Sequence, residues 1–247
     1  MVVDPFLKGF SFYLVVLEFI CDIILTVIKV GKCVVFDLDG TLLDTLKDLN
    51  CACNYALREN GYPIISIEET RMFIGNGIRL LIERSLKGKL ENVDKVFNDF
   101  KEYYFSHYNV YTKKYPNIDN VLAYLKNKNC ILGVLSNKNE IVLKKICDEL
   151  FCDAFDIVLG DSPNRLKKPA FDGLVEISNK FNVNIEDIIY IGDSDVDVKT
   201  AINAKCRGVF VSYGFRDKKS LIDSGAKIIC DSTIDLLKKL ELIIQWA

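Results

Sequence analysis

Residues 33–41, CVVFDLDGT, join an apolar run to an acidic turn, and much of the architecture of this 247-residue chain can be inferred from that junction. Cys33–Phe36 is continuously apolar, as are parallel strands that are covered on both faces. Ligands of open parallel sheets bind beyond the carboxyl ends of the strands, so we expect Asp37 and Asp39 at a ligand-binding edge. A simple turn explains Asp39 and Gly40, but it does not explain a second acid at Asp37.

Similar β-rich runs recur along the chain, and each is followed by a helical pattern. The further expected strands are Ile131–Ser136, Ile157–Leu159, Ile188–Ile191, Gly208–Val211 and Ile228–Cys230. This alternation predicts an α/β fold, with a parallel sheet that carries helices on both faces. No strand-like run interrupts the stretch from about Asp44 to Tyr115, whose periodic segments predict an inserted helical subdomain.

Residues suited to one phosphate-and-metal site follow four of the expected strands. They are Asp37 and Asp39 after the first, Ser136, Asn137 and Lys138 after the second, Lys168 before a proline after the third, and Gly192–Asp197 (GDSDVD) after the fourth. Carboxylates suit magnesium, whereas hydroxyl, amide and ammonium groups suit phosphate oxygens. Each later group has another explanation when taken alone: helix capping for Ser136 and Asn137, a solvated charge run for Lys168, and the helix dipole for the acids of Gly192–Asp197. One shared site explains why all of them occur together.

These segments resemble the four sequence motifs of the haloacid dehalogenase-like phosphatase superfamily. The matching residues are DLDGT at 37–41, SNK at 136–138, Lys168 before a proline, and GDSDVD at 192–197. The resemblance covers roughly residues 33–247 and implies a Rossmann-like, doubly wound core, an aspartyl-phosphate intermediate and magnesium. The insertion resembles the C1 cap of that superfamily. We therefore expect a catalytic core of residues 31–44 and 115–247 and a helical cap of residues 45–114.

The resemblance also implies a role for each motif residue. Asp37 would be the nucleophile and a metal ligand, and Asp39 would be the general acid and then the general base. The backbone carbonyl of Asp39 would also bind the metal. Asp193 would complete the metal shell and Asp197 would support it. The residues expected to bind the phosphoryl group or the substrate are Thr41, Ser136, Asn137 and Lys168. Asn137 would orient the substrate or Asp39, and Lys168 would also neutralise Asp37.

The cap segment Phe73–Arg79, FIGNGIR, and the later Tyr115–Ile118 resemble phosphoglycolate phosphatases and their close relatives. Gly75 and Gly77 would bring backbone N–H groups near a small anion, and Arg79 would pair with its carboxylate. A helix–helix turn with a surface arginine explains the same segment equally well. We expect a phosphatase that acts on a small phosphorylated metabolite, with 2-phosphoglycolate as the leading candidate.

Several alternatives stay open. A pyrophosphatase, a sugar-phosphate phosphatase or a nucleotide phosphatase would use the same scaffold. A protein of another class, a membrane-tethered or oligomeric interaction protein, would carry the motifs as a vestigial site. The 32 basic and 34 acidic residues nearly cancel, and no basic block indicates a nucleic-acid partner. Nine cysteines without zinc-type spacing indicate reduced thiols, and hence the cytoplasm.

Residues 10–30 form the most hydrophobic run of the chain, long enough to span a bilayer as a helix. Glu18 and Asp22, near its centre, oppose insertion about as strongly as the apolar residues favour it. A narrow polar stripe on the helix consists of Ser11, Glu18, Asp22, Thr26 and Lys29. We expect a helix within residues 1–30 that packs on the domain or on a partner subunit in a homodimer. A membrane anchor is the main alternative, and a signal segment is the third.

Overall fold

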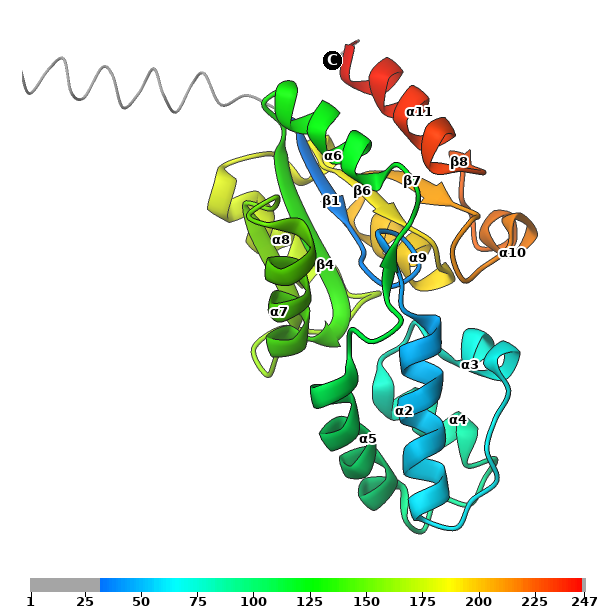
Figure 1. Ribbon diagram of the computed structural model, residues 1–247. Helices are drawn as coiled ribbons and strands as arrows, with labels where there is room; N and C mark the ends of the chain where they lie inside the picture. Colours follow the sequence, from blue (N-terminus) through cyan, green and yellow to red (C-terminus); the bar gives the residue numbers. More distant parts are fainter. Residues whose placement is uncertain (1–31, 246–247) are drawn as a thin grey trace, which may run out of the picture.

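The computed structural model describes residues 32–245, and its core is a parallel sheet between two layers of helices (Figure 1). The sheet consists of β1 (Cys33–Phe36), β4 (Ile131–Asn139), β5 (Ile157–Asp161), β6 (Ile189–Gly192), β7 (Arg207–Val211) and β8 (Ile229–Cys230). The spatial order is β5-β4-β1-β6-β7-β8, and all neighbouring strands are parallel. By position in the chain this is 3-2-1-4-5-6, the order of a Rossmann sheet. The predicted doubly wound α/β core is confirmed.

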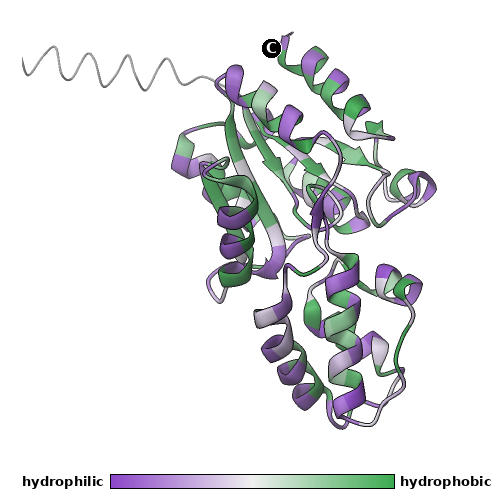
Figure 2. Ribbon diagram, in the orientation of Figure 1, coloured by the Kyte–Doolittle hydropathy of each residue, from purple (hydrophilic) through white to green (hydrophobic). Residues whose placement is uncertain are grey.

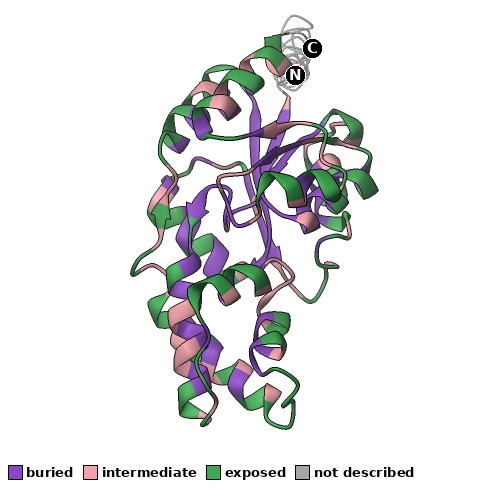
Figure 3. Ribbon diagram, turned by 90° about the vertical axis from the view of Figure 1, so that its right-hand side faces the viewer, coloured by how far each residue is buried: buried purple, intermediate pink, exposed green. Residues whose placement is uncertain are grey.

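Two helical layers cover the sheet. One contains α6 (Ile118–Asn127), α7 (Glu140–Phe151) and α11 (Thr233–Gln245), and the other contains α8 (Asp172–Phe181), α9 (Asp195–Ala204) and α10 (Lys218–Asp223), with a 3-10 turn at Ile185–Asp187. Residues of β1 alternate between the layers, as the period of a strand requires. Val34 and Phe36 belong to the first apolar core, whereas Cys33 and Val35 belong to the second. The strands are accordingly hydrophobic in Figure 2 and buried in Figure 3.

The helical insertion forms a separate bundle at the carboxyl ends of the strands (Figure 1). It contains α2 (Leu46–Glu59), α3 (Ile67–Phe73), α4 (Ile78–Ser85) and α5 (Val93–His107). The chain leaves the core through β2 (Leu43–Asp44) and returns through β3 (Lys113–Lys114), and these two strands pair antiparallel. The bundle lies between β1 and β4 in the chain, so the predicted α-helical cap in the C1 position is confirmed.

The six expected strands all form, and the largest difference lies in β4. This strand continues past Ser136 to Asn139, with a register shift between Leu135 and Asn139. Asn139 then caps α7 by accepting hydrogen bonds from the backbone N–H groups of Ile141 and Val142. Ser136 and Asn137 are therefore strand residues, and the capping alternative applies to Asn139 instead.

The expected helix within residues 1–30 lies outside the described residues. Among residues 32–245, none of the helices combines the length and the apolar character needed to cross a membrane.

Candidate active site

The candidate active site lies where the order of the sheet reverses. From β1, the chain builds the sheet outward through β4 on one side and through β6 on the other. Asp37 follows β1, Ser136 lies near the end of β4, and Asp193 follows β6. The Asp37 N–H donates to the Ile191 carbonyl oxygen at 2.8 Å, so the pairing of β1 with β6 continues into the site. Such a switch point is the usual ligand crevice of open α/β sheets.

Three buried carboxylates converge at this point. Asp37, Asp193 and Asp197 each offer an oxygen atom, and these atoms all lie within 4.8 Å of one another. Burial raises the pKa of Asp37 to about 7 against the opposing charge of Lys168. Burial also raises the pKa of Asp193 well above its usual value, and Asp197 and Asp37 add to this effect. A hard cation with oxygen ligands would relieve this repulsion, so the donor set fits magnesium.

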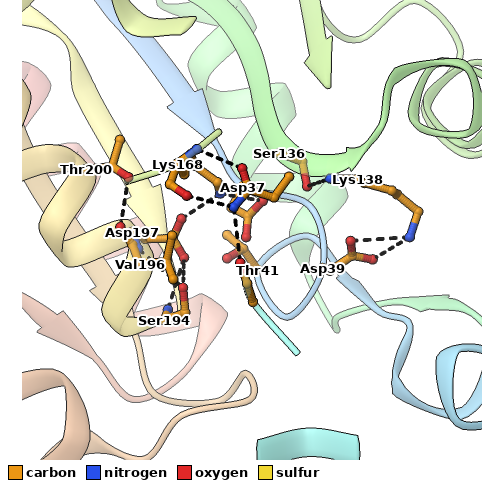
Figure 4. Close-up of polar contacts among 12 residues, drawn as sticks. Asp37, Asp39, Thr41, Ser136, Lys138, Lys168, Ser194, Val196, Asp197 and Thr200 are labelled. Carbon is orange, nitrogen blue, oxygen red and sulfur yellow. Dashed lines mark hydrogen bonds and ion pairs between the residues drawn. The ribbon is translucent and has the colours of Figure 1, made fainter. Parts of the chain in front are cut away.

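Lys168 supplies the positive charge inside the cluster (Figure 4). Its Nζ lies 2.9 Å from Asp37 Oδ1 and 2.7 Å from Asp197 Oδ1, and it donates to the Tyr190 hydroxyl at 3.0 Å. Burial alone would lower the pKa of Lys168, but Asp197 and Asp37 raise it above its usual value. The two ion pairs therefore favour the charged form of the lysine beside Asp37.

Asn137 positions the backbone of Lys168. Its Oδ1 accepts from the Lys168 N–H at 2.8 Å, and its Nδ2 donates to the Lys168 carbonyl oxygen at 3.0 Å. The same Nδ2 lies 3.3 Å from the Gly75 carbonyl oxygen in the cap. The amide expected to bind substrate is thus bonded to protein groups on both sides of the pocket.

Asp197 is oriented by the start of α9. Its Oδ2 accepts from the backbone N–H of Ser194 at 3.1 Å and from the Ser194 hydroxyl, which in turn caps the helix. Its Oδ1 accepts from Lys168 and from the Tyr190 hydroxyl, each at 2.7 Å. Burial alone would raise the pKa of Asp197, but Lys168 and Ser194 hold it below its usual value. Asp197 therefore ties Lys168 to the carboxylate cluster.

Asp193 is enclosed by the turn after β1 and the loop after β7. Its Oδ2 accepts from the Phe215 N–H at 2.6 Å, and its Oδ1 lies 3.4 Å from the Thr41 hydroxyl, the donor. Gly40 has φ +89, and a Cβ added there would lie 2.2 Å from Asp193 Oδ2. The glycine of the DLDGT motif is therefore needed for close approach as well as for the turn. Thr41, expected to bind phosphate, contacts Asp193.

The Asp39 side chain lies apart from the three carboxylates. Its Oδ1 accepts from Thr45 Oγ1 at 2.7 Å and from Lys138 Nζ at 2.9 Å. The Lys138 Nζ also donates to the Tyr104 hydroxyl at 2.6 Å. Figure 4 shows Asp39 and Lys138 facing each other at one side of the site. Of the expected metal ligands, the structure therefore groups the side chains of Asp37, Asp193 and Asp197, and not that of Asp39.

The cap closes the pocket over these residues. The pocket is lined from the core by Asp37, Asp39, Ser136, Asn137, Lys138, Lys168, Asp193 and Ser194, from the cap by Leu49, Ile74, Gly75, Gly77, Ile78 and Leu81, and from the loop after β7 by Phe215 and Arg216. Gly77 is thus brought to the site as expected, but Arg79 is not. The Arg79 side chain is 45% exposed and pairs with Asp94 and Glu83 on the outer surface of the cap.

Arg216 is a pocket residue that the sequence motifs do not contain. Its guanidinium donates to the carbonyl oxygens of Arg71 at 2.6 Å, Met72 at 3.3 Å and Ile74 at 2.8 Å, at the end of α3. A cation there satisfies carbonyls that a helix end leaves free. The contact between Lys138 and Tyr104 was not predicted either. Lys138 belongs to the SNK segment, but the sequence motifs do not indicate that Tyr104 of the cap accepts a hydrogen bond from it.

Comparisons with known proteins agree with this geometry. The sequence profile described as haloacid dehalogenase-like hydrolase matches residues 34–211. The phosphoglycolate phosphatase of Neisseria meningitidis is 31% identical over 202 residues, which cover 79% of this chain and 86% of the relative. That of Aquifex aeolicus is 32% identical over 185 residues, which cover 74% and 86%.

Solved structures agree as well. A protein from Lactobacillus delbrueckii, classed as a phosphoglycolate phosphatase, superposes with a TM-score of 0.80 at 31% identity, covering 87% of this chain and 98% of that one. A similarly classed protein from Haemophilus somnus gives a TM-score of 0.79 at 28% identity, covering 85% and 97%.

Proposed function

This chain belongs to the haloacid dehalogenase-like hydrolases and is a phosphoric monoester hydrolase, and on that premise we propose that it hydrolyses 2-phosphoglycolate through a phosphorylated Asp37. The observation that carries the proposal is the convergence of Asp37, Asp193 and Lys168 at one pocket under the cap. We propose the same division of the chain as its motifs indicate, with residues 45–114 as the cap and residues 31–44 and 115–247 as the core.

The metal of this site would be magnesium. The carboxylates of Asp37 and Asp193, with the backbone carbonyl of Asp39, would hold the ion, and Asp197 would support it. When bound, the ion supplies positive charge that offsets the repulsion between a phosphate dianion and the attacking carboxylate. Three clustered carboxylates beside one lysine support this assignment.

The residues of the chain then divide the work of phosphoryl transfer. An oxygen of Asp37 attacks phosphorus, while Lys168 and the Ser136 hydroxyl bind oxygens of the transferring group. The carboxyl group of Asp39 gives its proton to the ester oxygen as the bond from phosphorus to that oxygen breaks. Asp39 then takes a proton from the water that hydrolyses the aspartyl phosphate. The buried pocket under the cap excludes other water from these steps.

The choice of substrate follows the relatives and the pocket. The relatives from Neisseria and Aquifex are phosphoglycolate phosphatases. The Gly75–Gly77 loop and the Arg216 side chain line the same pocket as the carboxylates, and a second anionic group of a small ester would fit against them. Pyrophosphate, sugar phosphates and nucleotides are the competing substrates. The ordered carboxylate cluster counts against a vestigial site in an interaction protein.

We also infer that the enzyme acts in the cytoplasm. The cysteines among residues 32–245 are free, as expected in a reducing compartment. Attachment of residues 1–30 to a partner subunit or to a membrane stays a proposal, since those residues lie outside the described part of the chain.

Phosphate release from a panel of esters tests the proposed function. Purified protein with magnesium would be given 2-phosphoglycolate, pyrophosphate, a hexose phosphate, a nucleoside monophosphate and p-nitrophenyl phosphate. We expect kcat/KM to be highest for 2-phosphoglycolate, by about tenfold or more, since a hydrogen bond to a charged group contributes about 1.5–3 kcal/mol and about 1.4 kcal/mol corresponds to tenfold. Higher kcat/KM for another ester would reassign the substrate, and no release from any ester would refute the phosphatase.

A further inference from the structure

A buried lysine joins the cap to the Asp39 carboxylate. The Lys138 side chain is 2% exposed, and its Nζ lies 2.9 Å and 3.3 Å from the two Asp39 oxygens. The same Nζ donates to the hydroxyl of Tyr104, which is also buried, at 2.6 Å. An ammonium group has three N–H donors; the two oxygens of the Asp39 carboxylate share one of them, and the Tyr104 hydroxyl takes a second. Lys138 therefore bonds to Asp39 and to the cap at the same time, unlike a simple phosphate ligand.

The three residues come from three separate parts of the fold. Asp39 lies in the turn after β1, Lys138 near the end of β4, and Tyr104 on α5 of the cap. The Tyr104 ring packs in the interior of the cap, 5.4 Å from the Phe100 ring, so its hydroxyl moves with α5. The second donor to Asp39 is Thr45, which immediately precedes α2 of the cap. Both groups that hold the Asp39 carboxylate are thus connected to the cap.

We propose that Lys138 and Tyr104 are positioning residues, which hold the Asp39 carboxyl for proton transfer to the leaving oxygen when the cap is in place. The inference rests on the proposed function, in which Asp39 is the general acid. Tyr104 fixes the Lys138 ammonium. The ammonium and the Thr45 hydroxyl hold Oδ1 of Asp39, so Oδ2, 3.3 Å from Nζ, is the oxygen that carries the transferred proton. Their hydrogen bonds join them to Asp39 and to each other, and not to Asp37. The cap thereby acts on one step, protonation of the leaving group, as well as on access to the pocket.

Such a role has a specific kinetic signature. An alkoxide leaving group needs a proton as it departs, whereas a nitrophenolate leaves without one. If Asp39 is no longer held in position, the hydrolysis of alkyl phosphate esters should become slower, whereas the hydrolysis of p-nitrophenyl phosphate should change little. The ratio kcat/KM reports steps up to the first irreversible one, so later hydrolysis of the phosphorylated enzyme does not mask the difference.

The experiment compares kcat/KM for 2-phosphoglycolate, phenyl phosphate and p-nitrophenyl phosphate in the full-length enzyme with magnesium. Tyr104→Phe should lower kcat/KM for 2-phosphoglycolate by about 10-fold to 100-fold, with phenyl phosphate intermediate and p-nitrophenyl phosphate within about threefold. Lys138→Met should show the same order with a larger loss, and Lys138→Arg should recover part of it. Adding Tyr104→Phe to Lys138→Met should cost little more, because the tyrosine acts through the lysine.

Tyr108→Phe is the matched control. The Tyr108 hydroxyl also joins the cap to the core, by donating to Glu149 of α7, but it does not contact Lys138. Its removal should leave the ratio between the three esters unchanged. Equal losses for all three esters in the Tyr104 and Lys138 variants, or no loss for any, would overturn the inference while leaving the phosphatase intact. A wild-type enzyme that releases no phosphate would instead remove the proposed function and this inference with it.

Discussion

Lys168 Nζ lies 2.7 Å from Asp197 Oδ1, and the two side chains are 3% and 0% exposed. A buried ion pair of this kind is costly to form and still more costly to break, because removing one partner leaves an unpaired charge. Here the pair also places the ammonium 2.9 Å from Asp37 Oδ1. One contact therefore connects the stability of the core to the chemistry of the site.

Lys168→Met should cost both stability and activity. We expect the free energy of unfolding to fall by about 3–5 kcal/mol, because the charge of Asp197 loses its partner. Denaturant unfolding measures this change. Lys218→Met is the control, since the Lys218 pair with Asp231 is more than half exposed on both sides and should contribute at most about 1 kcal/mol. Equal losses in both variants would contradict the role of burial.

Asp37→Asn should abolish turnover and leave the fold intact. The amide is nearly isosteric with the carboxylate but is no nucleophile, so we expect kcat to fall by about a thousandfold or more. Phosphate release under saturating ester measures the loss, and circular dichroism checks the fold. Appreciable remaining activity would exclude Asp37 as the attacking group.

Magnesium should be required for activity and should stabilise the protein more at high pH. Burial raises the pKa of Asp37 from 3.8 to about 7, so folding favours the protonated carboxyl over that window. In the metal-free protein, Asp37 therefore costs stability as the pH rises from about 4 to about 7. Magnesium needs the carboxylate, so protons compete with it below about pH 7.

Melting temperatures with and without magnesium test the direction of this pH dependence. The increase on adding magnesium should be larger at about pH 8 than at about pH 5. A chelator should stop phosphate release, and excess magnesium should restore it. A larger stabilisation at the lower pH, or full activity in the chelator, would contradict the carboxylate cluster as the metal site.

Gly40→Ala should disrupt the site far more than its backbone strain alone explains. The added Cβ would lie 2.2 Å from Asp193 Oδ2, so Asp193 must move out of the cluster. Gly61→Ala is a matched control, because Gly61 also has positive φ, +72, but no atom lies within 4 Å of its added Cβ. We expect about 1–2 kcal/mol of destabilisation at Gly61 and at least about 2 kcal/mol more at Gly40, with loss of magnesium binding there. Chemical denaturation and calorimetry would measure these effects, and equal values would refute the steric argument.

Arg216→Met should weaken closure of the cap. It removes hydrogen bonds from the core to three carbonyl oxygens at the end of α3. We expect KM to rise by about tenfold, since the substrate must then order the Gly75–Gly77 loop itself. Arg84→Met is the control, because Arg84 donates to the Phe73 carbonyl oxygen from within the cap. An unchanged KM for Arg216→Met would show that the hydrogen bonds of Arg216 do not contribute to closure of the cap.

Local sequence patterns were sufficient to predict the sheet and most of its site. Continuous apolar runs such as Cys33–Phe36 identify parallel strands, and residues at their carboxyl ends must share one edge of the sheet. For this reason Asp37, Asp193 and Lys168 could be assigned to one site before the fold was known. Arg79 could not be placed in the same way, because residues on a helix next to a loop can face either the pocket or solvent, and this arginine pairs with Asp94 outside.

The amino-acid sequence alone determines the fold class, the strand ends and the positions of the motif residues. These features depend on strand and helix periodicity and on turn chemistry, which are local properties of the chain. Contacts between the cap and the core depend instead on how two separately folded parts meet. Only the tertiary structure shows that Tyr104 reaches Lys138, 34 residues away, and that Arg216 reaches Ile74, 142 residues away. No local pattern encodes such pairs, since their geometry follows from packing of the whole chain.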